Sequence, residues 1–227
     1  MAAGRSVDVL ILAAHVAELA GLEATLDASL RGRVRGLRIE AHAVGVGLAV
    51  AGVGAMRALA ATRARAALLL GSCGSYAPTP VGGRLGLVLP DSVQLVDAAT
   101  VDGSAAYPGP MPVRATLNRA LRAGLARGQR GVLRGALAVT PGITTDDALA
   151  SRLAAHSGCV AENLEALPVA LACASYGLPF AVLLVNTNDV GSQGRTQWLA
   201  HHRAAAMRGA EALLGWLDRG APGLPAK

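Results

Sequence analysis

Residues 67–75 read Ala-Leu-Leu-Leu-Gly-Ser-Cys-Gly-Ser, an apolar run that passes directly into a polar stretch with two glycines. A short apolar run of this kind is typical of a buried strand. The small residues Gly71, Ser72, Cys73 and Gly74 would let the backbone approach a ligand closely and present its N–H groups. A tight turn without a ligand accounts for the same residues equally well. No Gly-Lys-Ser/Thr follows, so this stretch is not a P-loop.

Apolar segments of strand or helix character extend to both sides of this stretch. Strands are predicted at residues 7–12, 37–44, 67–70, 85–89, 93–96, 132–139 and 179–185, and helices at 18–30, 49–66, 115–127, 145–156, 165–176 and 196–217. This alternation predicts an α/β fold with a mixed or parallel central sheet flanked by helices. Turns with glycine are expected after three strands, at residues 45–47, 71–74 and 142. Ligands of such sheets bind beyond the carboxyl ends of the strands, so we expect a small-molecule site there.

The composition limits the function classes. The 227 residues fit a single domain over 1–227, with a loose tail after about residue 219. A hydrophobic content of 52% with only 16% charged residues excludes a largely disordered chain. The net charge of +6 comes from scattered arginines, and aromatic residues make up only 3%, so no nucleic-acid surface is expected.

Other simple classes find no support in the sequence. The three cysteines form no C-x-x-C motif, and neither a disulfide framework nor a metal site is expected. Residues 1–7 contain no apolar leader, and no apolar run reaches the ~18 residues of a membrane span. We therefore expect a cytoplasmic protein that has no membrane partner.

Three further groups of residues are candidates for chemistry. Glu18 follows the first strand at a predicted helix start, where it could activate a water or simply interact with the helix dipole. The stretch Glu162-Asn163-Leu164-Glu165 could clasp sugar hydroxyls or cap a helix. The stretch 186–189, Asn-Thr-Asn-Asp, follows a strand and could contact a ligand or form Asx-turns.

In their order and spacing, these residues resemble the purine nucleoside phosphorylases and methylthioadenosine/S-adenosylhomocysteine nucleosidases, over most of the chain from Val7 to Trp198. Members of this family carry a Glu after the first strand, a G-x-x-G turn, a Met-Glu pair and a late Ser-Asp or Ser-Asn. The counterparts here are Glu18, Gly71–Gly74, Leu164-Glu165 and Thr187-Asn188. The resemblance implies a three-layer nucleoside phosphorylase-like fold, a purine nucleoside as the ligand, no cofactor, and a homodimer or larger homo-oligomer.

Within this family the futalosine hydrolase subgroup is the most similar. It tends to read Glu-Asn-Met-Glu, where this chain has Glu162-Asn163-Leu164-Glu165, and it has a Trp ten residues after a late Asn, as Trp198 follows Asn188 here. The resemblance implies cleavage of futalosine to hypoxanthine in menaquinone biosynthesis. Glu18 would deprotonate the water, Glu165 would bind the ribose, and Asn188 would engage N7 and O6 of the base. Asn163, Leu164, Trp198 and Gly71–Gly74 would line the substrate.

Two features of this resemblance bear on the reaction. Asn188 favours a 6-oxopurine, because its amide N–H can donate to O6, whereas a shift of one residue to Asp189 would favour adenine. Phosphorylases of the family hold phosphate with an Arg that corresponds to Leu69, and an apolar side chain cannot neutralise a phosphate dianion. The rival interpretations are an adenine-releasing nucleosidase, a phosphorylase, and an inactive homologue that only binds nucleosides. No aromatic residue lies at 144–147, where relatives stack the base, which leaves Tyr76, Tyr107, Phe180 or Trp198 for that position.

Overall fold

The structure, a computed structural model, describes residues 5–76 and 82–226. Residues 1–4, on which the expectation of no leader partly rests, lie outside the described part. The strands are β1 (Arg5–Ser6), β2 (Val9–Ala13), β3 (Arg31–Val34), β4 (Leu37–Ala43), β5 (Thr62–Arg63), β6 (Ala66–Ser75), β7 (Leu87–Val88), β8 (Ser92–Leu95), β9 (Arg114–Thr116), β10 (Ala136–Val139), β11 (Ala161–Asn163) and β12 (Phe180–Asp189). The helices are the 3-10 helix η1 (Val16–Leu22) and the α-helices α1 (Leu48–Ala61), α2 (Ala98–Val101), α3 (Arg119–Ala126), α4 (Asp147–Ser157), α5 (Ala166–Ser175) and α6 (Gly194–Asp218).

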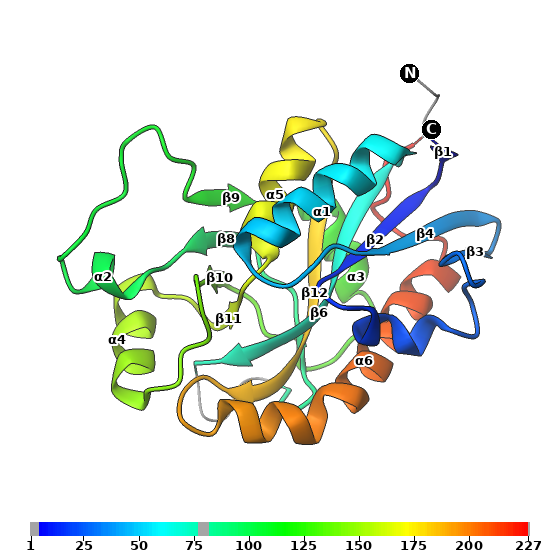
Figure 1. Ribbon diagram of the computed structural model, residues 1–227. Helices are drawn as coiled ribbons and strands as arrows, with labels where there is room; N and C mark the ends of the chain where they lie inside the picture. Colours follow the sequence, from blue (N-terminus) through cyan, green and yellow to red (C-terminus); the bar gives the residue numbers. More distant parts are fainter. Residues whose placement is uncertain (1–4, 77–81, 227) are drawn as a thin grey trace.

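A mixed sheet forms the centre of the molecule (Figure 1). Among the described residues it has ten strands, in the order β3-β4-β2-β6-β11-β10-β8-β9, with β12 and β7 continuing from the other edge of β6. β6 pairs in parallel with both β2 and β12, whereas β11 joins it antiparallel. The predicted α/β fold with a mixed sheet flanked by helices is therefore confirmed.

Each face of the sheet packs against its own group of helices. Along β2, Val9 and Ile11 belong to a core with Trp216 of α6, on the face that also carries η1 and α3. Leu10 and Leu12 point to the opposite face, where α1 and α5 lie side by side. Successive strand side chains alternate between faces, so each apolar strand contributes to both cores. The sheet and its two groups of helices therefore form three layers. Among the described residues, no helix is long and apolar enough to cross a membrane.

The predicted helix over residues 18–30 is wrong. The segment forms η1, which ends at Leu22, and the chain then turns so that Leu26 forms an antiparallel bridge to Gly32 of β3. Leu19, Leu22 and Leu26 are nevertheless buried. The i, i+3 spacing of the first two suits a 3-10 helix, which repeats every three residues. Gly21 lets this segment approach α6 closely, since a Cβ on Gly21 would lie only 2.5 Å from the Ala210 Cβ.

The predicted turn at Gly71–Gly74 is also wrong, because β6 continues without interruption through Ser75. Two other segments differ in kind from the prediction. The predicted helix over 115–127 begins as strand β9, and its helical part α3 starts only after the N-cap Asn118. Residues 98–111, for which neither a strand nor a helix is predicted, open with the short helix α2. The remaining predicted elements agree in kind and differ mainly at their ends.

The residues after Arg219, expected to be loose, make several contacts with the body of the molecule. The Trp216 indole N–H donates to the Pro222 carbonyl at 3.0 Å, and the Arg65 guanidinium donates to the Pro225 carbonyl at 2.9 Å. Ala221 is buried. Buried aromatic N–H groups and partly buried guanidinium groups need acceptors, and the tail supplies them.

Candidate active site

One edge of β6 has a gap in its strand pairing. Within the described residues, β2 pairs with β6 up to Leu69, and β11 pairs with it only at Gly74 and Ser75. Side chains occupy the gap at Ser72. The Ser72 N–H donates to Glu18 Oε1 at 3.0 Å, and the Ser72 carbonyl accepts from Asn163 Nδ2 at 3.3 Å. The gap therefore collects residues that are far apart in the sequence.

The Glu18 carboxylate is held by donors on both of its oxygens. Glu18 is the third residue of η1, and its Oε2 accepts from the N–H groups of Ala14 at 3.0 Å and His15 at 3.3 Å. Its Oε1 accepts from both the N–H and the hydroxyl of Ser72. A Cβ at Gly71 would lie only 2.9 Å from this Oε1. Glycine is therefore needed at position 71 for this approach, not for a turn.

The surroundings of Glu18 favour its neutral form. The pKa of this carboxyl is raised from 4.5 to about 7. Burial is the largest cause and the charge of Glu165 adds to the rise, whereas the main-chain donors of Ser72, His15 and Ala14 oppose it. The side chain nevertheless keeps some solvent exposure, so water can reach it. A partly exposed carboxyl with a pKa near neutral pH is suited to general base catalysis.

Glu165 provides a second carboxylate from the opposite face of the sheet. It lies between β11 and α5, is only 4% exposed, and its Oε1 accepts from the Gly47 N–H at 2.9 Å. Gly47 has a φ of +85°, a left-handed conformation that glycine adopts readily. Burial raises the pKa of Glu165. Two carboxylates thus interact across one site, one from η1 and one from the start of α5.

Asn163 and Leu164 occupy the link between β11 and α5. The Asn163 Oδ1 accepts from the N–H groups of Glu165 and Ala166, and its Nδ2 donates to Ser72 as described above. The structure therefore gives the Asn163 amide a bracing role, in which it ties the start of α5 to β6. Leu164 is partly exposed.

The remaining members of the G-S-C-G stretch have different surroundings. The Cys73 side chain is buried in the core beneath α1 and α5, where burial raises the pKa of its thiol. A Cβ on Gly74 would lie 2.7 Å from Asn188 Nδ2 and 2.9 Å from the Val190 side chain. Gly74 therefore allows β12 to bring Asn188 close to β6.

Asn188 and Asp189 end β12 after an irregularity in its pairing with β6. The Asn188 Oδ1 accepts from the Thr187 hydroxyl at 2.8 Å, and its Nδ2 donates to the Asp189 carbonyl at 2.9 Å, which leaves one amide N–H for another partner. Asp189 Oδ2 instead accepts from Arg84 at 3.0 Å and from Gln197 at 3.2 Å. The Asp189 carboxylate thus forms an ion pair within the protein, whereas the Asn188 amide keeps one N–H for a ligand.

Trp198 lies on α6 near the same gap. Its indole N–H donates to the Ser72 hydroxyl at 3.4 Å, and its ring stacks on His202 with a centroid distance of 4.6 Å. The residue is 38% exposed. The structure thereby brings Glu18, Ser72, Asn163, Glu165 and Trp198 into one connected group.

The sequence groups Glu162 with Glu165 in one stretch that could clasp sugar hydroxyls or cap a helix. Glu162 lies on β11 and not at a helix start, and it is 7% exposed. Its carboxylate accepts from the Tyr76 hydroxyl at 3.0 Å and from the Thr144 hydroxyl at 2.6 Å. Strand alternation with Asn163 could have indicated that Glu162 points elsewhere.

Of the aromatic candidates for base stacking, Phe180 is buried in the core.

The described residues contain no group of three or more His, Cys, Asp or Glu that could hold a metal ion.

The sequence over residues 28–218 matches the Phosphorylase superfamily. The chain belongs to this superfamily. The matched range covers most of the sheet and includes the segments that carry Glu165, Asn188 and Trp198, whereas Glu18 lies before it. A search of curated proteins finds no match to this chain.

Solved structures of related fold come from several bacteria. A *Helicobacter pylori* futalosine hydrolase mutant is similar with a TM-score of 0.81 and 16% identity, covering 95% of this chain and 99% of its own. A *Helicobacter pylori* 5′-methylthioadenosine/S-adenosylhomocysteine nucleosidase mutant with 5′-methylthioadenosine in its active site has a TM-score of 0.80 and 16% identity, covering 94% and 99%. The S-adenosylhomocysteine nucleosidase of *Streptococcus pyogenes* has a TM-score of 0.80 and 19% identity, covering 100% of both chains. At these identities the similarity shows a shared fold.

Proposed function

We propose that this protein hydrolyses the N-glycosidic bond of a purine nucleoside, with futalosine as the substrate that its motifs favour. The observation that carries the proposal is the pair of carboxylates, Glu18 and Glu165, that interact beside the gap in the sheet. The structures of similar fold include nucleosidases and a futalosine hydrolase.

Glu18 acts on the nucleophile. With its pKa raised to about 7, a large fraction is ionised at neutral pH, and the ionised form is basic enough to take a proton from water. The water oxygen forms a bond to C1′ of the ribose as the bond from C1′ to the purine nitrogen breaks. The bonding electron pair leaves with the purine, and the water proton passes to Glu18.

Glu165 acts on the sugar. A carboxylate accepts hydrogen bonds from two neighbouring hydroxyls, such as those of a ribose. Its negative charge also stabilises the positive charge that develops on the ring as the glycosidic bond weakens. Burial raises the pKa of Glu165. Hydroxyl donors from a bound sugar would oppose this rise and favour the ionised form of the carboxyl.

Asn188 acts on the base. Its free amide N–H can donate to O6 or N7 of a 6-oxopurine, where the negative charge of the leaving base collects. The ion pair with Arg84 supports Asn188 over Asp189 as the base contact, since it keeps the Asp189 carboxylate on a partner within the protein. This assignment favours hypoxanthine over adenine as the base released.

Water is favoured over phosphate as the nucleophile. A phosphate dianion would be placed near the Glu165 carboxylate, whose charge already raises the pKa of Glu18, and near Glu18 itself. Leu69, at the position where phosphorylases carry an Arg, is 1% exposed in the apolar core beneath α1 and α5. No cation therefore reaches the site from this position.

Base release measured by chromatography tests the proposal. Futalosine, aminofutalosine, methylthioadenosine and inosine are each offered with and without phosphate. We expect hypoxanthine from futalosine without phosphate, and much slower release by the Glu18→Gln variant. Adenine release would favour an adenine-specific nucleosidase, and release only with phosphate would favour a phosphorylase. Silence on all four would overturn an enzymatic role and leave a nucleoside-binding homologue.

The Asn188→Asp substitution is expected to shift the base preference. An Asp can carry a proton to N7 and accept from a 6-amino group, whereas it repels the developing charge on O6. We expect the ratio of kcat/KM for aminofutalosine to that for futalosine to rise about tenfold or more. Asp189→Asn is the matched control, because it changes the neighbouring residue in the opposite sense and should leave this ratio near the wild-type value. A shift in the control alone would move the base contact to Asp189.

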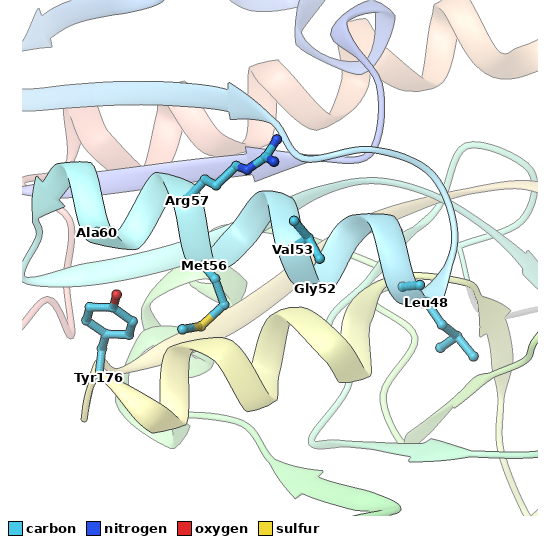
Figure 2. Close-up of a pocket in the computed structure, with 8 residues that line it drawn as sticks. Leu48, Gly52, Val53, Met56, Arg57, Ala60 and Tyr176 are labelled. Atoms are coloured by element: carbon cyan, nitrogen blue, oxygen red, sulfur yellow. The ribbon is translucent and has the colours of Figure 1, made fainter.

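We further propose that the protein forms a homodimer through an apolar groove along α1 and α5. The groove has a volume of about 680 Å³ and is lined by Leu48, Ala49, Gly52, Val53, Met56, Arg57, Ala60 and Tyr176. Figure 2 shows Met56 extending from α1 toward α5, near Tyr176, with Arg57 on the other side of the helix. Val50 and Val53 on α1 are more than half exposed. Exposed apolar surface of this kind marks interaction sites, and α1 begins directly after Gly47, the donor to Glu165.

The Val53→Asp substitution is expected to convert the dimer to a monomer, because a buried unpaired charge at the interface is strongly unfavourable. Light scattering after size exclusion measures the mass. Met207→Asp is the control, since Met207 is an equally exposed apolar residue on α6, outside the groove. A wild-type protein that has the mass of one chain at micromolar concentration would contradict the dimer.

A further inference from the structure

A chain of two hydrogen bonds connects α6 to the Glu18 carboxylate. The Trp198 indole N–H donates to the Ser72 hydroxyl at 3.4 Å, and the Ser72 hydroxyl donates to Glu18 Oε1 at 3.2 Å. Helix α6, strand β6 and helix η1 meet at this point. The indole is itself held by stacking on His202, whose ring nitrogen lies 3.2 Å from the Trp198 carbonyl.

The Ser72 hydroxyl differs from the other hydrogen-bond donors to Glu18 in one respect. The other donors to this carboxylate are the main-chain N–H groups of Ala14, His15 and Ser72, which have fixed directions. A hydroxyl rotates, and it can donate or accept. The direction of the Ser72 hydroxyl proton therefore depends on its own second partner.

That second partner is the Trp198 indole, which can only donate. The indole N–H occupies one lone pair of the Ser72 hydroxyl oxygen. The hydroxyl proton must then point to a different group, one that can accept it. Glu18 Oε1 is the acceptor within reach. The indole thus selects the hydroxyl orientation that supports the ionised form of Glu18, since a hydrogen bond donated to a carboxylate favours its charged state.

We propose that Trp198 is a positioning residue for Glu18: its indole N–H orients the Ser72 hydroxyl so that it donates to the carboxylate that activates water. The proposal rests on the proposed nucleosidase function for the role of Glu18, but the contact itself can be tested without any substrate. It assigns to Trp198 a role beyond lining the substrate.

The charges around Glu18 set the direction of the expected effect. Burial and the charge of Glu165 raise the pKa of Glu18, whereas the surrounding donors lower it. His15, the N-cap of η1, is exposed, and its Nδ1 accepts from the Ala17 N–H. His202 stacks on the indole from α6. Removing a donor from Ser72 therefore removes an interaction that favours the ionised carboxylate, and the pKa of Glu18 should rise.

The test measures the titration of Glu18 directly, by ¹³C NMR of protein labelled at the Glu side-chain carboxyl. The Glu18 signal is identified by its loss in Glu18→Gln. The variants are Trp198→Phe, which keeps an aromatic ring but lacks the N–H, Ser72→Ala, and the double variant. Met207→Ala, a truncation of an exposed side chain on the same helix, is the control.

We expect Ser72→Ala to raise the Glu18 pKa by about one, the effect of losing a hydrogen bond to a charged group. Trp198→Phe should raise it by roughly a third of that amount, because the indole acts through the hydroxyl. In the Ser72→Ala background, Trp198→Phe should add nothing, since the intermediary is gone. Met207→Ala should titrate as the wild type does.

Two results would overturn the positioning role. In one, Trp198→Phe leaves the Glu18 titration unchanged and only raises KM, as a residue that merely lines the substrate would. In the other, its effect persists in full without the Ser72 hydroxyl, which would show that the indole acts by another route. If the titration behaves as expected but no nucleoside is cleaved, the contact stands and the proposed function fails.

Discussion

Glu18→Gln is expected to lower kcat for base release by about 10²–10⁴-fold, the usual contribution of a general base. The amide has nearly the shape of the carboxylate but cannot accept the proton of the attacking water. Because Glu18 interacts with water and not with the ribose in this proposal, KM should change little. Single-turnover base release from futalosine measures the effect.

The same carboxyl sets a pH dependence for the wild type. Only the ionised form is a base, so kcat/KM should fall as the pH is lowered through about 7, the raised pKa of Glu18. A profile that stays flat down to pH ~5 would contradict this role. The exposed Glu23 at the end of η1 gives the matched control, because Glu23→Gln makes the same change on the same segment and should leave both rate and profile unaltered.

As the pH rises, the contribution of Glu18 to the unfolding free energy should fall, whereas kcat/KM should rise. The pKa of Glu18 is higher in the folded protein than the ordinary value of 4.5, so folding favours the protonated form. This contribution is fully present below about pH 4.5 and is lost as the pH rises through about 7. Between about pH 4 and pH 8, the unfolding free energy of Glu18→Gln should therefore gain up to about 3 kcal/mol relative to the wild type. Denaturant unfolding at several pH values measures the difference, and parallel curves for the two proteins would contradict it.

Glu165→Gln is expected to lower kcat/KM by about 100-fold, through a weaker contact with the ribose hydroxyls and the loss of a negative charge near the developing cation. It should also shift the pH profile. The charge of Glu165 raises the pKa of Glu18, so removing that charge should move the acid limb of kcat/KM to lower pH. Initial rates from pH ~5 to ~9 measure both effects.

Glu162→Gln provides the matched control for this variant. Glu162 belongs to the same four-residue stretch, but its carboxylate binds Tyr76 and Thr144. We expect Glu162→Gln to lower the melting temperature, because a buried network loses its charged acceptor, and to leave the acid limb in place. If Glu162→Gln moved the acid limb and Glu165→Gln did not, the ribose contact would belong to Glu162.

The sequence by itself determined the layered architecture. Apolar runs such as Leu10–Leu12 and Leu68–Leu70 predicted buried strands, and both lie in the centre of the sheet. Asp146 was predicted near a helix start and is the N-cap of α4, with its carboxylate accepting from the Leu149 N–H. These features depend on periodicity and capping within about ten residues, which the sequence displays directly.

Only the tertiary structure decided how the candidate site is assembled. It made Gly71–Gly74 part of a continuous strand, placed the Cys73 side chain in the core, and separated Glu162 from Glu165. Ser72 meets Glu18 across 54 positions of the sequence and Trp198 across 126. No local pattern encodes such contacts, because they depend on where β2 leaves β6 and β11 joins it. Strand pairing of this kind results from packing over the whole sheet.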